Sequence, residues 1–200
     1  MDGAVLPSTL MVKAGRWWFK RRSVSPLPFL VVMFFLPPDF YWEGIGFLIP
    51  LAIAFLAEGL RLWAVGYAGS ATRTRGDKVA DFVHSGPYCF VRNPLYVANI
   101  TLYTSCTVLF GFTYLSILFF VYSCIQYHLI VAFEESTLLG TFGTVYANYT
   151  RNVPRWFPSL MPLIPSTSHA FELRRAVRSE RSTLIAIATI GLAYFIKARS

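Results

Sequence analysis

Long apolar blocks separated by short polar segments form the main pattern of this chain. The first block, from about residue 26 to 36, ends at two prolines, which stop a helix. The second, from 44 to about 66, is long enough to cross a bilayer, which takes about 20 helical residues. The last block, 182–196, is a marginal crossing. We therefore expect an all-α integral membrane protein, with residues 26–36 as a short anchor or a half-buried helix.

The centre of the chain predicts a helical hairpin. No residue between Arg92 and Glu134 carries a formal charge, and this stretch of 41 residues suffices for two crossings of about 20 residues each. The tripeptide Gly-Phe-Thr at 111–113 supplies the turn, so both ends of the hairpin lie on the same side of the membrane. The apolar blocks together predict about five membrane helices in a single domain, 1–200.

A charged pair interrupts the second block. Glu58 and Arg61 are three residues apart and share one face of a helix. Because charges are costly in lipid, we expect the pair to face protein or the aqueous rim. A simple ion pair near the helix end explains these residues as well as a catalytic role does.

Composition and charge agree with a membrane location. The chain is 55% hydrophobic and only 14% charged, with a net charge of +8. Of the 18 Lys and Arg residues, all but Arg61, Lys197 and Arg199 lie in the N-terminal segment, 69–94 and 133–181, whereas the loop 37–44 has two acids and no base. The positive-inside rule assigns the basic segments to the cytoplasm. This clustering argues against nucleic-acid binding, and three scattered cysteines suggest neither a disulfide framework nor a metal centre.

Residues capable of chemistry gather at the cytoplasmic ends of the hairpin. Gly86-Pro87 predicts a turn, and Asn93-Pro94 predicts a helix start, because asparagine is a favoured N-cap and proline fits the first helical position. If the returning helix continues to about Gly140 or Gly143, it brings Glu134-Glu135 to the same rim. Helix-end N–H groups opposite a carboxylate suit a small zwitterion. A well-capped membrane helix with solvated acids is the alternative.

These motifs resemble the signature of the isoprenylcysteine carboxyl methyltransferase family, which the related phosphatidylethanolamine N-methyltransferases largely share. The resemblance rests on VHSGPYCFVRNPLY, which ends at residue 96, and on EESTLLGTFGTVYANYTRNVPRWFP at 134–158. It covers roughly residues 58–158 and leaves the hydrophobic segment 182–196 as an extra C-terminal helix. It implies a membrane methyltransferase that uses S-adenosylmethionine in a cytoplasmic pocket. The substrate would be an amphiphilic small molecule or a lipidated molecule among the membrane lipids, methylated on a carboxyl oxygen or an amine.

The resemblance also implies functional residues. The cofactor contacts would be Asp81, Phe82, Val83, Tyr88, Asn93, Pro94, Leu95, Tyr96 and Glu134. Glu134 would bind the ammonium group of the cofactor. The catalytic candidates are Glu135, which would hold a partner arginine or act as a base, and Arg92, which would bind an anionic headgroup. Methyl transfer needs alignment and exclusion of water, and it requires no metal.

The chain departs from the family pattern at two positions, and the second bears on the substrate. The frequent histidine of the family's Arg-His-Pro triplet is Asn93 here, which preserves capping but offers no titratable ring. The arginine that the family places four residues before its equivalent of Glu134, to meet the substrate's carboxylate, is Ile130 here. The acceptor is therefore not necessarily a prenylcysteine.

Two other functions remain open from the sequence. A membrane-embedded NADPH-dependent reductase of the sterol-reducing type has a similar helical layout. A non-enzymatic membrane scaffold is disfavoured, because the polar groups collect at one rim and form no path through the bilayer. The methyl acceptor and the oligomeric state are not determined by the sequence.

Overall fold

The computed structural model describes residues 8–68, 82–166, 170–181 and 185, and every regular element among them is helical. The elements are α1 (Thr9–Arg21), α2 (Leu27–Phe35), α3 (Leu48–Ala68), the 3₁₀ helix η2 (Gly86–Cys89), α4 (Pro94–Leu109) and α5 (Thr113–Asn152). A further helical stretch covers 173–181. The all-α prediction is therefore confirmed for the described residues.

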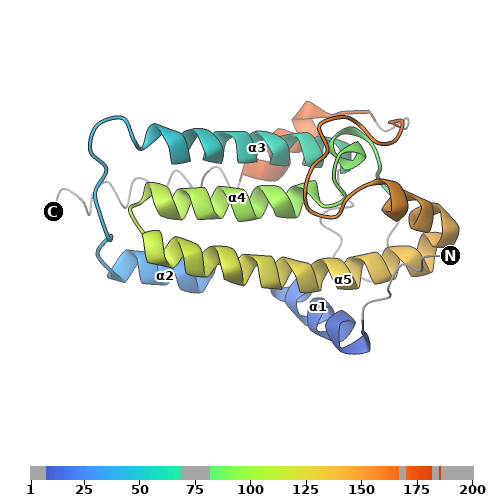
Figure 1. Ribbon diagram of the computed structural model, residues 1–200, viewed down its shortest axis with the longest axis horizontal. Helices are drawn as coiled ribbons and strands as arrows, with labels where there is room; N and C mark the ends of the chain where they lie inside the picture. The colour runs from blue at the N-terminus through green and yellow to red at the C-terminus, as the bar shows by residue number, and fades with distance from the viewer. Residues whose placement is uncertain (1–7, 69–81, 167–169, 182–184, 186–200) are drawn as a thin grey trace.

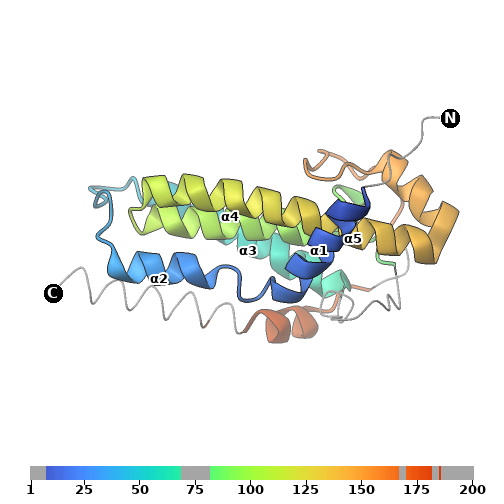
Figure 2. The same ribbon diagram turned by 90° about the horizontal axis from the view of Figure 1, so that it is seen from below.

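Helices α3, α4 and α5 lie side by side, with α4 in the middle (Figure 1). Small side chains line the contact between α3 and α4, where Ala54 and Ala57 pack against Leu102. Small residues let helix backbones approach closely, which is the usual way helices associate in membranes. Helix α1 crosses α5 obliquely, and α2 lies near the opposite end of the bundle (Figure 2).

The predicted hairpin is present. Helix α4 begins at Pro94, as expected, and α5 begins at Thr113 after the predicted turn. Gly111 has a φ of +82°, and a Cβ atom there would lie 2.2 Å from the carbonyl oxygen of Phe40. This turn therefore needs glycine both for its backbone conformation and for its close contact with the loop between α2 and α3.

The loop between α2 and α3 closes the far end of the hairpin. The Asp39 carboxylate accepts hydrogen bonds from the backbone N–H groups of Thr113 (2.6 Å) and Tyr114 (3.1 Å), which otherwise lack partners at the start of α5. The Trp42 indole N–H donates to the carbonyls of Val108 (3.3 Å) and Leu109 (2.9 Å) at the end of α4. Both helix ends are thus satisfied by one external segment.

Two of the described helices, α3 and α5, are long and apolar enough to cross a membrane. Their outer faces expose large apolar side chains, as a lipid-facing surface requires: Ile49, Phe55, Leu56, Ile117, Leu118, Phe120, Val121 and Ile125. The helix predicted for the second apolar block is confirmed, but its start is shifted. Residues 44–47 form a turn, and the helix begins at Leu48.

The prediction of about five membrane helices is not confirmed. Helix α2 has nine residues and α4 has sixteen, which at 1.5 Å per residue gives about 14 and 24 Å against a hydrocarbon thickness of about 30 Å. The predicted helix 182–196 lies outside the described residues. Helix α1 was not among the expected elements, because it precedes the first long apolar block and carries several basic residues.

Helix α5 has forty residues and extends well past the start of α4 (Figure 1). It bends at Gly143, whose φ of 51° and ψ of −122° lie outside the helical range. The prediction that this helix runs past the two acids to about Gly140 or Gly143 is confirmed. After the bend, a second helical piece reaches Asn152.

The chain after α5 returns over the segment that precedes α4. Backbone hydrogen bonds join Arg92 N–H to the Pro154 carbonyl (2.8 Å), Ser159 N–H to Phe90 (3.1 Å) and Leu163 N–H to Cys89 (3.0 Å). These bonds make the returning segment 153–163 a wall at the rim of the bundle, a feature that the sequence did not predict.

The charged pair of α3 faces protein, as expected. Arg61 Nε lies 3.7 Å from Glu58 Oε2, and the Arg61 guanidinium also pairs with Glu180 on the helical stretch 173–181. All three residues are buried. Next to this cluster, the Phe171 ring packs on Gly66, where a Cβ atom would lie 2.1 Å from the ring. The stretch 170–181 is therefore attached to α3 by both charge and packing.

Candidate functional site

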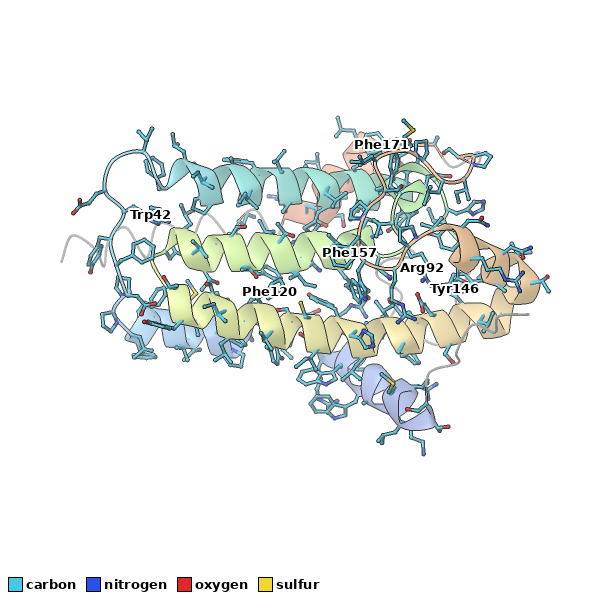
Figure 3. The ribbon with its side chains drawn as sticks, in the orientation of Figure 1. Trp42, Arg92, Phe120, Tyr146, Phe157 and Phe171 are labelled. Carbon is cyan, nitrogen blue, oxygen red and sulfur yellow. The ribbon has the colours of Figure 1, made fainter. Side chains whose placement is uncertain are left out.

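The candidate site lies at the end of the bundle where α4 begins. Arg92 and Tyr146 lie at this end, and Trp42 lies at the opposite end (Figure 3). Four segments meet here: η2, the first turn of α4, residues 133–149 of α5 and the returning segment 153–163. The hairpin thus brings together the two motifs that the sequence analysis singled out.

Glu135 lies between two arginines. Its Oε1 accepts a hydrogen bond from Arg92 Nη1 (2.8 Å) and one from Arg155 Nε (3.2 Å), and its Oε2 pairs with Arg155 Nη2. Glu135 is buried, and the Arg92 side chain is only 15% exposed. A buried ion pair requires such multiple hydrogen bonds to offset its desolvation cost. We call these three residues the rim cluster, and they join α5, the start of α4 and the returning segment.

Of the two roles suggested for Glu135, the geometry favours the first. Glu135 holds not one partner arginine but two, and both of its oxygens accept hydrogen bonds from them. A general base needs an oxygen within reach of the proton that it removes. Because both oxygens of Glu135 already accept hydrogen bonds from arginines, a role as a base is unfavourable. Arg92 is likewise directed at Glu135, so its predicted role towards an anionic headgroup stays a prediction.

Glu134 lies next to the start of α4. Its carboxylate interacts with the hydroxyl of Tyr96, in the first turn of that helix. The Tyr96 ring stacks on Tyr127, with centroids 4.7 Å apart and an interplanar angle of 26°. The carboxylate also interacts electrostatically with the hydroxyl of Tyr88. Three of the residues that the sequence predicted for the cofactor, Tyr88, Tyr96 and Glu134, are therefore brought together.

Asn93 occupies the N-cap position but does not cap with its side chain. Its carbonyl accepts from Tyr96 N–H and Val97 N–H, both at 3.1 Å. Its side-chain amide instead donates to the carbonyl of Arg155 (3.1 Å). The expected side-chain cap is wrong, because the returning segment offers this amide a carbonyl acceptor that local sequence cannot reveal.

Phe82 packs into an aromatic cluster on the late turns of α5. The centroid of its ring lies 4.9 Å from that of the Tyr149 ring and 5.2 Å from that of the Tyr146 ring. Val153 completes the buried group. The Tyr149 hydroxyl donates to the carbonyl of Tyr88 (2.9 Å), which anchors η2 on α5. Burial raises the pKa of the Tyr88 hydroxyl above its ordinary value, so this group is a neutral hydrogen-bonding partner.

Three of the remaining predicted cofactor residues are near the same rim. Pro94 is buried, and Val83 and Leu95 are half-buried. Asp81 lies outside the described residues. A direct contact of any of these residues with a cofactor stays a prediction.

Three residues of the site were missed or given another role by the sequence analysis. Arg155 is the second partner of Glu135, a role that its position in the chain does not indicate. Tyr127 stacks on Tyr96 from inside an apolar run, and Arg22 acts electrostatically on Glu134 from the end of α1. A tyrosine in a membrane helix and an arginine in a basic flank carry no local signal of such roles.

Comparisons with known proteins agree with the motifs. Residues 49–140 match the model of the isoprenylcysteine carboxyl methyltransferase (ICMT) family, which confirms the resemblance. The cobalt-zinc-cadmium resistance protein CzcN of Cupriavidus metallidurans is 28% identical over 119 residues, which are 60% of this chain and 54% of that protein. The chain thus spans about half the length of this relative. No solved structure matches the chain. Together with the apolar helices α3 and α5, the family match indicates a membrane protein.

Proposed function

Proceeding from the match of residues 49–140 to the isoprenylcysteine carboxyl methyltransferase family, we propose that this protein is a membrane methyltransferase that uses S-adenosylmethionine and acts on an amphiphilic acceptor. The observation that carries the proposal is the contact between Glu134 and Tyr96. It brings together two motifs that lie 38 positions apart in the chain. The side chains of Tyr88, Tyr96 and Glu134 at this end of the hairpin form the proposed cofactor recess.

The residues of this recess fit the cofactor. Glu134 supplies a carboxylate for the ammonium group, and Tyr88 and Tyr96 supply aromatic rings, which attract cations such as a sulfonium through their π faces. The Phe82 ring is packed in the aromatic cluster, so in this proposal Phe82 contacts the cofactor through its backbone. When bound, S-adenosylmethionine supplies an activated methyl group. The chain then needs to align the acceptor with that group and to exclude water.

The rim cluster and the returning segment serve these two needs. Glu135 ties Arg92 and Arg155 together, which holds the segment 153–163 over the start of α4. A closed wall keeps water from the reacting groups, and a rigid wall keeps donor and acceptor in line. Glu135 and Arg155 are therefore positioning residues in this proposal, and the cluster supports the recess from its aqueous side.

The acceptor enters from the bilayer and need not be a prenylcysteine. At Ile130, which is fully buried, the side chain packs with Ile100 and Tyr127, and Trp156 of the returning segment covers this cluster. No arginine can meet a substrate carboxylate from this position. An amphiphile with an amine, thiol or acid headgroup and an apolar tail fits the recess and its apolar surroundings. By the positive-inside argument, the recess opens to the cytoplasm.

Ligand binding to the detergent-purified protein tests the proposal against the reductase alternative. Isothermal titration calorimetry should detect binding of S-adenosylmethionine and none of NADPH. The variant Glu134→Gln should lose about 10- to 100-fold in affinity, because a hydrogen bond to a charged group contributes about 1.5–3 kcal/mol. Glu172→Gln, which changes an exposed acid away from the recess, is the matched control and should bind normally.

Binding of NADPH in place of S-adenosylmethionine would overturn the proposal. The acceptor is then sought by transfer of a labelled methyl group. N-acetyl-farnesylcysteine, phosphatidylethanolamine and a total lipid extract are compared under the same conditions. Efficient turnover of the prenylcysteine alone would show that Ile130 carries no information about the acceptor.

A further inference from the structure

Helix α1 lies outside the region that matches the family model, yet it packs directly on the helix that carries Glu134. At Gly15 the two backbones touch, because a Cβ atom there would lie 2.0 Å from the carbonyl oxygen of Leu129. One turn later, the centroid of the Phe19 ring lies 5.5 Å from the centroid of the Phe133 ring, and Phe133 is the residue before Glu134. The end of α1 is therefore placed beside the recess.

Arg22, which follows the last residue of α1, is held on this side of α5. Its guanidinium lies 3.8 Å from the centroid of the Phe19 ring, and its Nη1 donates to the Phe19 carbonyl (3.1 Å). The Arg22 carbonyl accepts from Ser25 Oγ (3.1 Å), and Ser25 Oγ accepts from Gln126 Nε2 (2.7 Å). Contacts at both ends thus fix this turn of chain along α5, between Gln126 and Phe133.

From this position, the positive charge of Arg22 acts on the carboxylate of Glu134 and on the hydroxyls of Tyr96 and Tyr127. Glu135, the other charge that acts on Glu134, is already paired within the rim cluster. The recess therefore has a negative charge from α5 and a positive charge from α1, and the Tyr96 hydroxyl interacts with the negative one. An α-amino acid carries a carboxylate and an ammonium on one carbon atom, so it matches this arrangement of charges.

We propose that Arg22 binds the α-carboxylate of S-adenosylmethionine while Glu134 binds its α-ammonium. This inference rests on the proposed function and adds a cofactor-binding residue from outside the family region. Arginine suits this role, because its planar guanidinium can donate two parallel hydrogen bonds to a carboxylate. The neighbouring Arg21 is excluded from it, since it is exposed and its guanidinium lies over the Trp17 ring, 4.1 Å from the centroid.

The test compares two ligands that differ only in the carboxylate. S-adenosylmethionine and its decarboxylated form are titrated calorimetrically into the wild-type protein, Arg22→Gln, Arg22→Lys and the control Arg21→Gln. We expect Arg22→Gln to bind S-adenosylmethionine at least about tenfold more weakly and to bind the decarboxylated form within about twofold of the wild type. Arg22→Lys should recover part of the affinity, and Arg21→Gln should match the wild type for both ligands.

Three results would overturn the inference. An equal loss of affinity for both ligands would show that Arg22 acts through Glu134 or through the fold. Thermal melting of the variant shows which, because a variant that unfolds loses its melting transition. Unchanged affinity for S-adenosylmethionine would remove Arg22 from the site. A wild-type protein that binds neither ligand would overturn the proposed function and this inference with it. If the wild-type protein binds S-adenosylmethionine, a change in the affinity of Arg22→Gln bears on this inference alone and leaves the proposed function intact.

Discussion

At the scale of single residues, two neighbouring glutamates have opposite surroundings. Glu135 accepts hydrogen bonds from two arginines, whereas Glu134 interacts with the hydroxyl of Tyr96. Consecutive residues of an α-helix point about 100° apart, so one acid faces the returning segment and the other faces the start of α4. The adjacent pair therefore divides into a structural acid, Glu135, and the acid that we propose to bind the cofactor, Glu134.

This division predicts different effects of the same chemical change. Glu135→Gln should lower the melting temperature in detergent by about 4–8 °C, because Arg92 and Arg155 would lose their common counter-charge at a cost of about 2 kcal/mol. Glu134→Gln, the matched control one residue away, should melt close to the wild type. Equal melting of the two variants would contradict a structural role specific to Glu135.

At the scale of helices, the hairpin depends on a segment outside it. The Asp39 carboxylate accepts from the first two N–H groups of α5, and the Trp42 indole reaches the last carbonyls of α4. The two hairpin helices are joined by only a short turn at this end. The loop between α2 and α3 therefore fixes how they sit against each other.

Asp39→Ala should destabilise the protein by about 1 kcal/mol, the usual cost of losing an N-terminal cap. Denaturant or thermal unfolding of the purified protein measures the change. Glu43→Ala, which removes an exposed acid from the same loop, is the control and should leave stability unchanged. A similar loss in both variants would mean that the net charge of the loop matters, and not the cap.

Elements with a local cause were predictable from the sequence, and contacts between distant segments were not. Pro94 and Gly111 impose their backbone conformation on a few residues, so the helix start and the turn were found correctly. The side chain of Asn93 was assigned wrongly, because a carbonyl 62 positions away competes for it. Arg22 was unassigned for the same reason, since only the crossing of α1 and α5 brings its charge near enough to act on Glu134.

At the scale of the whole molecule, the two ends of the bundle differ in character. One end holds the rim cluster and the tyrosines of the recess, and the other is closed by Asp39 and Trp42 (Figure 3). The described arginines Arg16, Arg22, Arg92 and Arg155 lie at the first end, and the acidic loop with Asp39 lies at the second. The proposed orientation places the first end in the cytoplasm.

Single cysteines at the two ends test this orientation in a background that lacks Cys89, Cys106 and Cys124. Glu43→Cys should react with a membrane-impermeant thiol reagent added to intact cells. Thr144→Cys, which is exposed just after the bend in α5, should react only after the membrane is permeabilised. Reaction of both positions from one face would contradict the assignment of the two ends to opposite sides.

The cap formed by Asp39 has a consequence for how related sequences change over evolution. Its partners at Thr113 and Tyr114 are backbone N–H groups, which every residue except proline supplies. Substitutions at those two positions therefore need no compensation, and position 39 should be restricted on its own to short hydrogen-bond acceptors. The rim cluster is different, because Glu135 meets its arginines side chain to side chain. Among homologues, position 135 should covary with 92 and 155, whereas the equally close contact of position 39 should leave no trace of covariation.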